Sequence, residues 1–118
     1  MLEIHENKDH TAYASQLEKI DAFFPVVVES FENGNVTGYG IYSCTPKKVT
    51  VHDFSDTNNL YLLDGIIRTM LFKAAMQGID YAEFDIKDDN KNVLLEKLKY
   101  GKSIESLNEF FSSCKNCK

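Results

Sequence analysis

The sequence predicts an α+β domain with a mixed, largely antiparallel central sheet, in which a three-strand meander is flanked by helices. The first reason is a cluster of β-rich runs between residues 24 and 54 that are joined by short turns. The second is a pair of helical patterns, at residues 60–77 and 92–100, that alternate with a strand-like run at 81–86. With 118 residues and no linker or low-complexity segment, the chain is expected to form a single domain, 1–118.

The first expected elements are a short strand and an amphipathic helix. Residues 2–5, LEIH, alternate apolar and other side chains, which favours a strand. In residues 10–24 the apolar side chains recur every three or four positions, which is typical of a helix with one buried face. The side chains expected on that face are Tyr13, Leu17, Ile20 and Phe24.

The three strands of the meander are marked by their turns. The dipeptide Asn33-Gly34 tolerates the positive φ angles of a tight hairpin and lies between two β-rich runs. A second turn is expected at residues 45–48, TPKK, before the run VTVHDF at 49–54. The third strand therefore returns antiparallel to the second.

The central helix has the strongest helical pattern in the chain. We expect it to run from Leu60 to Gln77, after several residues that can cap its start, and to end before Gly78. One apolar stripe should face the sheet, formed by Leu63, Ile66, Ile67, Met70, Leu71 and Ala74.

The last third of the chain predicts a strand and two further helices. Residues 81–86 alternate like a strand, and a helix should follow with Leu94, Leu95 and Leu98 facing inward before Gly101 ends it. Ser106 and Glu109 have the spacing of a capping box, which favours a short C-terminal helix and a CxxC tail at about 103–118.

Composition and charge exclude several classes of protein. A net charge of −5 argues against nucleic-acid binding, which uses clustered Lys and Arg. No apolar run approaches the roughly 20 residues that a membrane span requires, and the first residues lack the features of a secretory signal. We therefore expect a cytoplasmic protein whose three cysteines are reduced thiols. No residue pattern reports the oligomeric state, and a homodimer stays open.

Three phrases of the sequence resemble the GNAT acetyltransferase family. NVTGYGIYS resembles its third-strand phrase, and IIRTMLFKAAMQGIDYAEFDI resembles its central helix, which runs through a Gly-Ile pair into the fifth strand. NKNVLLEKLKYGK resembles the next helix, where the family has an Asn, a small residue three places later and a glycine at eleven. Those places hold Asn90, Val93 and Gly101. Together with the element order, the resemblance covers residues 24–102.

The resemblance implies an acyl-CoA-dependent N-acyltransferase, with acetyl-CoA or another acyl-CoA as cofactor. It also implies that the fourth and fifth strands splay apart to form the cofactor cleft, with the backbone of the fourth strand holding the pantetheine. The candidate cofactor contacts are then Phe54, Ser55, Asn58, Asp64, Gly65, Ile66 and Asn90.

The loop that should hold the pyrophosphate departs from the family pattern. The family has Gln/Arg-x-x-Gly-x-Gly/Ala before the central helix, so that backbone N–H groups can approach the phosphates. The corresponding window here is residues 58–63, where Tyr61 and Leu63 replace the glycines. We expect these large side chains to crowd the loop. A loop shifted to Asp64-Gly65 is the alternative, but Asp64 is also spaced to pair with Arg68, and Gly65 to allow close packing on the sheet.

The catalytic candidates are His52, Asp53 and Tyr100. The general-acid tyrosine of the family falls on Lys97, and Tyr100 is a nearby replacement unless it is a core residue. His52 and Asp53 lie on the fourth strand, where this family often places groups that deprotonate the amine, and histidine titrates in the right range. The alternative is that one of the two faces solvent and the other has a hydrogen-bonded partner across the strand.

The C-terminal cysteines suggest a different chemistry. Cys114 and Cys117 have CxxC spacing, which is half of a structural zinc site, with Cys44 and a histidine as further ligands. The pair is also compatible with redox cycling or with inert thiols. Three hypotheses follow: an acyl-CoA-dependent N-acyltransferase of unknown acceptor, a non-catalytic relative that binds a small molecule or a protein, and a metal or redox module.

Overall fold

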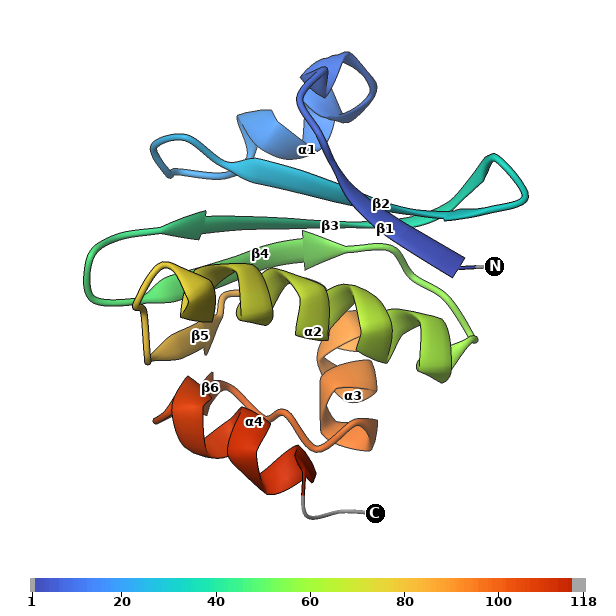
Figure 1. Ribbon diagram of the computed structural model, residues 1–118. Coiled ribbons are helices and arrows are strands. Elements are labelled where there is room, and N and C mark those ends of the chain that lie inside the picture. Colours follow the sequence, from blue (N-terminus) through green and yellow to red (C-terminus); the bar gives the residue numbers. More distant parts are fainter. Residues whose placement is uncertain (1, 116–118) are drawn as a thin grey trace.

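The computed structural model describes residues 2–115, and side chains as far as residue 112. Figure 1 shows the order of elements. They are β1 (Leu2–Asn7), the 3-10 turn η1 (His10–Tyr13), α1 (Ala14–Glu18), β2 (Val26–Glu32), β3 (Asn35–Cys44), β4 (Val49–Phe54), α2 (Leu60–Met76), β5 (Ala82–Phe84), α3 (Asp89–Lys97), β6 (Ser103–Ile104) and α4 (Leu107–Lys115).

The predicted mixed, largely antiparallel sheet is confirmed. The strands of the described residues form one sheet in the order β1-β2-β3-β4-β5-β6. Only β4 and β5 pair in parallel, because α2 connects them and returns the chain in the same direction. The meander turns where expected, since Asn33 and Gly34 adopt φ angles of 53° and 83° between β2 and β3. These are the positive values that a two-residue hairpin turn requires.

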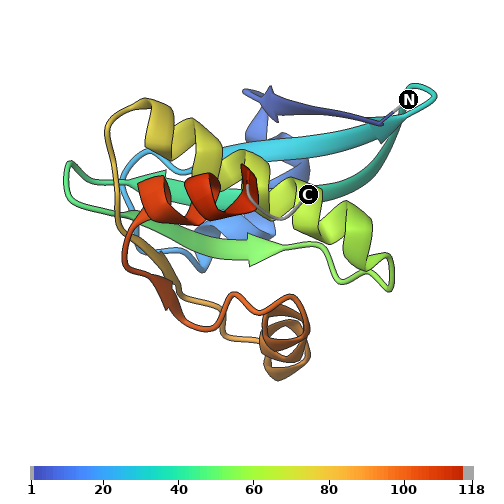
Figure 2. The same cartoon turned by 60° about the horizontal axis from the view of Figure 1, so that its bottom comes forward.

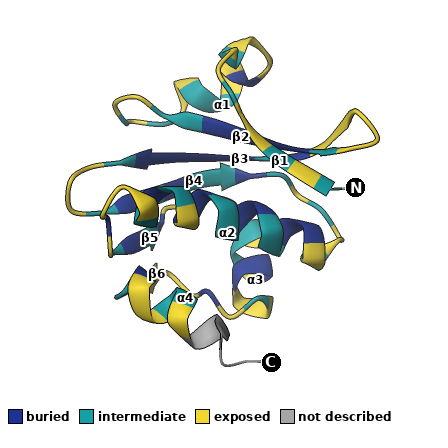
Figure 3. Cartoon of the chain, viewed as in Figure 1, coloured by how far each residue is buried: buried dark blue, intermediate teal, exposed yellow. Residues whose placement is uncertain are grey.

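The central helix α2 covers one face of the sheet, as predicted. Its N-cap is Asn59, whose Oδ1 accepts a hydrogen bond from the Leu62 N–H at 3.1 Å. Gly78 takes a left-handed conformation with φ 89° just after the helix. Figure 3 shows the buried residues of α2 against the strands behind it. The whole predicted stripe is fully buried: Leu63, Ile66, Ile67, Met70, Leu71 and Ala74.

Close packing of α2 depends on glycines of β3. A Cβ atom at Gly40 would lie only 2.7 Å from Met70 Sδ, and one at Gly38 only 2.9 Å from Ile66 Cδ1. A Cβ at Gly65, by contrast, would meet Ile4 Cδ1 at an ordinary 3.6 Å. The expectation that Gly65 provides the close helix contact is therefore wrong, because the strand glycines provide it.

The second face of the sheet carries the short segment η1–α1. Figure 2 shows α2 and α4 in front of the sheet and this segment behind it. Tyr13 anchors the segment, because its hydroxyl donates a 2.5 Å hydrogen bond to Glu29 Oε2 on β2 and both side chains are buried. Burial and this carboxylate raise the pKa of Tyr13 above its ordinary value. The residues that follow α1 are thereby held over β3 and β4.

The predicted helix over residues 10–24 is wrong in its length. It ends at Glu18, and Phe24 is 89% exposed instead of buried. Pro25 disfavours the α-helical conformation for the residue before it, and Phe24 accordingly has a φ of 53°. The apolar spacing continued past a point where the backbone leaves the helix.

The last elements are shorter than predicted. β5 holds three residues, and α3 ends at Lys97 with Leu98 as its C-cap and only half buried. Lys99 takes a left-handed conformation with a φ of 65° just after the C-cap, and Gly101, which was expected to end the helix, also does so with a φ of 68°. The helix start at Ser106 is as predicted, because its Oγ accepts a hydrogen bond from the Glu109 N–H.

Candidate functional site

A β-bulge places two polar residues of β4 on the same face of the sheet. Ile41 pairs with Asp53 and Tyr42 pairs with Val51, so His52 is an extra residue on β4. Val51 and Phe54 are both buried in the core under α2. His52 and Asp53, which lie between them, therefore both face the opposite side, where they line one cavity. The alternative in which one faces solvent and the other a partner across the strand is wrong because of this bulge.

The sheet opens beside the bulge. β4 and β5 pair only from Val49 to Val51, and the last hydrogen bond runs from the Asp85 N–H to the Val51 carbonyl at 2.9 Å. Further along, the Ser55 N–H donates to the Tyr39 carbonyl on the β3 side. Strand alternation then turns the N–H and C=O of Phe54 toward the side that β5 has left. This is the divergence of the fourth and fifth strands that the resemblance implies, and it leaves Phe54 without a pairing partner in β5, although Phe54 itself is fully buried.

Two adjoining cavities meet at His52. The first, of about 600 Å³, lies between the segment after α1, the end of β4 and the start of α3. The second, of about 560 Å³, lies over the start of β4, between residues 21–23 and β5. His52, Asp21 and Asp85 line both cavities. A two-substrate reaction needs two such spaces with a reactive group at their junction.

The carboxylate of Asp53 is held by two partners. Its Oδ1 accepts a hydrogen bond from Lys91 Nζ at 2.7 Å, and its Oδ2 accepts one from the Tyr39 hydroxyl at 2.8 Å. Burial disfavours the charged form of Lys91, but Asp53 outweighs this effect, and the pKa of Lys91 is raised. Burial, and then Asp53, raise the pKa of Tyr39 as well. Asp53 is therefore a fixed charge that joins β4 to α3, and not a free base.

The imidazole of His52 is half-buried, and its partner is a neutral hydroxyl, unlike the charged lysine that binds Asp53. Its Nε2 shares a 2.7 Å hydrogen bond with Ser43 Oγ, in which either atom can donate. Burial lowers the pKa of His52 below its ordinary value of 6.5, and the opposing effect of Asp85 is smaller. The ring is therefore mostly neutral near pH 7, which is the form that accepts a proton.

No family model and no curated protein matches the sequence, but several solved structures have a similar fold. The chain resembles a ribosomal-protein-alanine N-acetyltransferase from Brucella melitensis biovar Abortus 2308, with a TM-score of 0.63 and 14% identity over 83% of this chain and 90% of that one. The ribosomal-protein-S18-alanine N-acetyltransferase of Escherichia coli gives 0.62 and 12%, over 84% and 77%. A GNAT family acetyltransferase from Elizabethkingia anophelis with acetyl-CoA bound gives 0.59 and 10%, over 82% and 73%. The chain has a GNAT-like fold.

Within this GNAT-like fold, the entry of α2 differs from the expected crowding of a phosphate loop. Leu63 is fully buried in the core and Tyr61 is 83% exposed, so neither side chain blocks the helix start. Asn59 occupies it instead, because its side chain binds the Leu62 N–H and its carbonyl binds the Leu63 N–H. Residues 55–61 contain no glycine. The loop before α2 therefore does not fit the pyrophosphate of an acyl-CoA.

Tyr100 does not join the GNAT-like cleft. Its side chain is 6% exposed, and its hydroxyl donates to Asp64 Oδ1 at 2.6 Å, on the α2 side of the sheet. Asp64 Oδ2 also accepts a hydrogen bond from Arg68 Nε at 2.8 Å, which is the predicted i,i+4 pair. Tyr100 further contacts the rings of Phe84 and Phe110. The structure therefore places Tyr100 and Asp64 in a cluster that joins helices, away from His52.

The other predicted cofactor contacts are dispersed. Phe54 and Ile66 are fully buried in the core. Ser55 Oγ accepts a hydrogen bond from the Tyr39 N–H. Asn58 is exposed in the loop and Asn90 is exposed in the first turn of α3. None of these five residues lines one of the two cavities that meet at His52.

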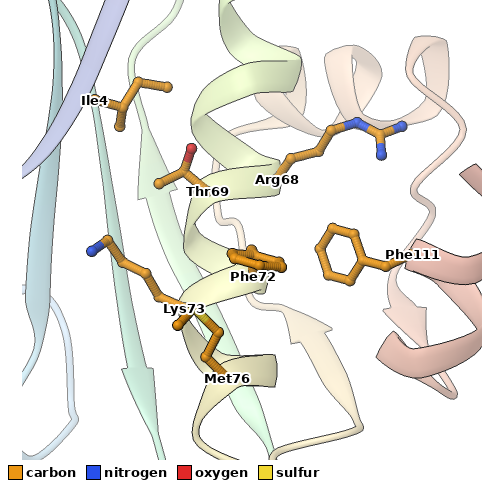
Figure 4. Close-up of a pocket in the computed structure, with 7 residues that line it drawn as sticks. All are labelled: Ile4, Arg68, Thr69, Phe72, Lys73, Met76 and Phe111. Carbon is orange, nitrogen blue, oxygen red and sulfur yellow. The ribbon is translucent and has the colours of Figure 1, made fainter. Parts of the chain in front are cut away.

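A third hollow lies on the α2 side and has a different character. Figure 4 shows its lining, in which Phe72, Met76 and Phe111 surround a space of about 470 Å³ with Ile4, Arg68, Thr69 and Lys73. Arg68 is paired with Asp64, and the lining holds no histidine and no carboxylate side chain among the described residues. The hollow therefore offers apolar contact and no acid–base pair.

The predicted thiol chemistry has no support in the described residues. The side chain of Cys114 and the whole of Cys117 lie outside them. Cys44 is half-buried, and burial raises the pKa of its thiol. Across the part of the chain that the structure describes, no three Cys, His, Asp or Glu side chains gather as a metal site. The helices described there are also too short or too polar to cross a bilayer.

Proposed function

We propose that this chain is an N-acyltransferase in which His52 takes the proton from an amine acceptor. The observation that carries the proposal is the β4 bulge, which sets a neutral, half-buried imidazole at the junction of two cavities and beside the point where β4 and β5 diverge. A general base works best when its pKa lies near or below the working pH, so that it is free to accept a proton. His52 meets that condition, whereas both carboxylate oxygens of Asp53 are already engaged by Lys91 and Tyr39.

The reaction balances with the groups present. An acyl thioester such as acetyl-CoA supplies a carbonyl carbon, to which the amine nitrogen bonds as the carbon–sulfur bond breaks. His52 accepts the proton that the nitrogen loses, and the thiol leaves with an equivalent proton from solvent. The Lys91–Asp53–Tyr39 chain holds the bulge, and with it His52, in place.

The solved structures support the reaction class by analogy only. The Brucella and Escherichia proteins are N-acetyltransferases named for an alanine of a ribosomal protein. A shared fold does not carry the substrate of one protein to another. The acceptor here, a small molecule or a protein, has to be identified from the residues of this chain.

The test is release of free thiol from acetyl-CoA in the presence of a panel of amines. We expect wild-type protein to release thiol and the His52→Gln variant to lose at least about 100-fold in rate, which is the typical contribution of a general base. His5→Gln changes an exposed histidine on β1 and serves as the matched control. Equal rates for wild type and His52→Gln, in proteins with the same circular dichroism, contradict the assignment.

A non-catalytic relative is the second candidate. The observation in its favour is the Asn59 cap, which fills the helix start where a GNAT enzyme needs free N–H groups for phosphates. In that case an amine or a thioester binds in the cavities without turnover. Chemical-shift changes at His52 on adding either compound, with no thiol release, would favour this reading.

A further inference from the structure

Two phenylalanines stand out at the tip of the loop between α1 and β2. Phe23 is 86% exposed and Phe24 is 89% exposed, more than any other large apolar side chain of the described residues. Exposed aromatic rings are costly in water, and such rings at a cavity mouth are typical of surfaces that a ligand covers. The position of each ring relative to the cavities decides which of the two can contact a ligand there.

Only one of the two rings belongs to the site. Phe23 lines the second cavity, together with Asp21 and Ala22 from the same loop. His52 and Thr50 of β4 line that cavity as well. Phe24 lines neither cavity. The chain thus offers a matched pair of phenylalanines, equally exposed, of which one is in the site.

The charges of this cavity favour a cation. Lys48 is committed to Glu83 at 2.9 Å, and Lys87 contacts Asp85 at 3.0 Å on the exposed surface. Asp21 has no ion pair within the described residues, and it lines both cavities together with His52. A carboxylate in this place attracts the ammonium form of an amine and brings it to the base.

We infer that the acceptor is a small amine that carries an aromatic or similarly sized apolar group, with its nitrogen between Asp21 and His52 and its apolar group against Phe23. This inference rests on the proposed function and names the acceptor class of the same site. It assigns the second cavity to the acceptor and leaves the first, beside the divergence of β4 and β5, to the donor. Phe23 is then a residue that determines specificity and takes no part in the chemistry.

The experiment compares two amines that differ in apolar surface. Initial rates with acetyl-CoA are measured for 2-phenylethylamine and for ethanolamine, with wild type, Phe23→Ala and Phe24→Ala. We expect wild type to favour 2-phenylethylamine at least tenfold in kcat/KM. Phe23→Ala should lose that preference through a higher KM and leave ethanolamine within about twofold, while Phe24→Ala should keep it. Asp21→Asn should raise the KM for both amines.

The outcomes separate this inference from the proposed function. Turnover with no preference between the amines, or equal effects of Phe23→Ala and Phe24→Ala, overturns the inference and leaves the acyltransferase standing. Without turnover, binding of 2-phenylethylamine alone is followed by amide chemical shifts. Binding that is lost in Phe23→Ala and kept in Phe24→Ala supports the aromatic-amine site and contradicts the acyltransferase. Absence of binding to wild type overturns the inference.

Discussion

At the scale of residues, the site depends on His52 and Asp53 sharing one face of β4. The two side chains have different roles because their partners differ. Each carboxylate oxygen of Asp53 accepts a hydrogen bond, from Lys91 or from Tyr39, whereas His52 has one hydrogen-bond partner among the described residues, Ser43. One therefore positions the strand and the other remains able to accept a proton.

The lowered pKa of His52 has a consequence for stability. A histidine whose pKa is lower in the folded state resists a proton that the unfolded chain accepts. The free energy of unfolding should then fall as the pH drops from about 6.5 toward the folded-state pKa of His52. Urea unfolding at several pH values between 7.5 and 5.5 measures this slope. His52→Gln should show a smaller loss than wild type, and an equal loss would show that His52 is not the group responsible.

Residue types on β4 could be predicted from the sequence, but their shared face could not. His52 and Asp53 were identified as candidates because of their strand and their chemistry. Strand alternation predicts opposite faces for neighbouring residues, and no local signal marks the bulge. Lys91 was missed because its partner is 38 residues away in the chain. Tyr39 lies between Gly38 and Gly40 on β3, so strand alternation places its side chain on the face of the sheet opposite these two glycines.

At the scale of elements, α2 forms most of the core with the sheet. Its apolar stripe was predicted correctly because six apolar residues repeat at helical spacing from Leu63 to Ala74, over about three turns. The helix over 10–24 failed because the same spacing ran on into a loop that Pro25 takes out of helical conformation. Periodicity reports which side chains could share a face, and it does not report where the backbone stops.

The contribution of the α2 stripe can be measured at Leu71. This side chain is fully buried, so Leu71→Ala should lower the free energy of unfolding by about 2 to 5 kcal/mol. Phe72→Ala changes the next residue, which is 52% exposed, and should cost clearly less. Urea unfolding of the two variants tests the difference. A loss below about 1 kcal/mol for Leu71→Ala is incompatible with a buried leucine.

At the scale of the whole molecule, a GNAT-like fold is combined with a start of α2 that differs from the phosphate loop expected from the resemblance. The element order and three sequence phrases were enough to predict the fold. The absence of glycines before α2 predicted a poor phosphate loop, but the reason is different. Asn59 caps the helix, while Leu63 turns into the core and Tyr61 turns outward.

Binding of acetyl-CoA tests this entrance. Wild-type protein should bind it weakly in calorimetric titrations, because the helix start is capped and lacks glycines. Asn59→Gly/Tyr61→Gly should bind more tightly by freeing the backbone, at a cost of about 1 kcal/mol in helix stability for the second change. Leu63 is left unchanged because it is a core residue. The matched control, Asn59→Ala/Tyr61→Ala, removes the same groups but keeps a Cβ atom. Micromolar affinity of wild type would show that the cap does not exclude phosphates.

The order of strands in the sheet also bears on how the chain folds. From β2 to β4 each strand pairs with its neighbour in sequence through a short turn, so these contacts are local in the chain. The pairing of β5 with β4 must wait for the crossover through α2. Contacts between residues distant in the chain form more slowly than local ones. We therefore expect a folding nucleus in the meander and α2, with β5 and α3 docking later. Both cavities lie between these two parts of the chain. The face of β4 that carries His52 and Asp53 is therefore expected to gain its neighbours from β5 and α3 only in the last step of folding.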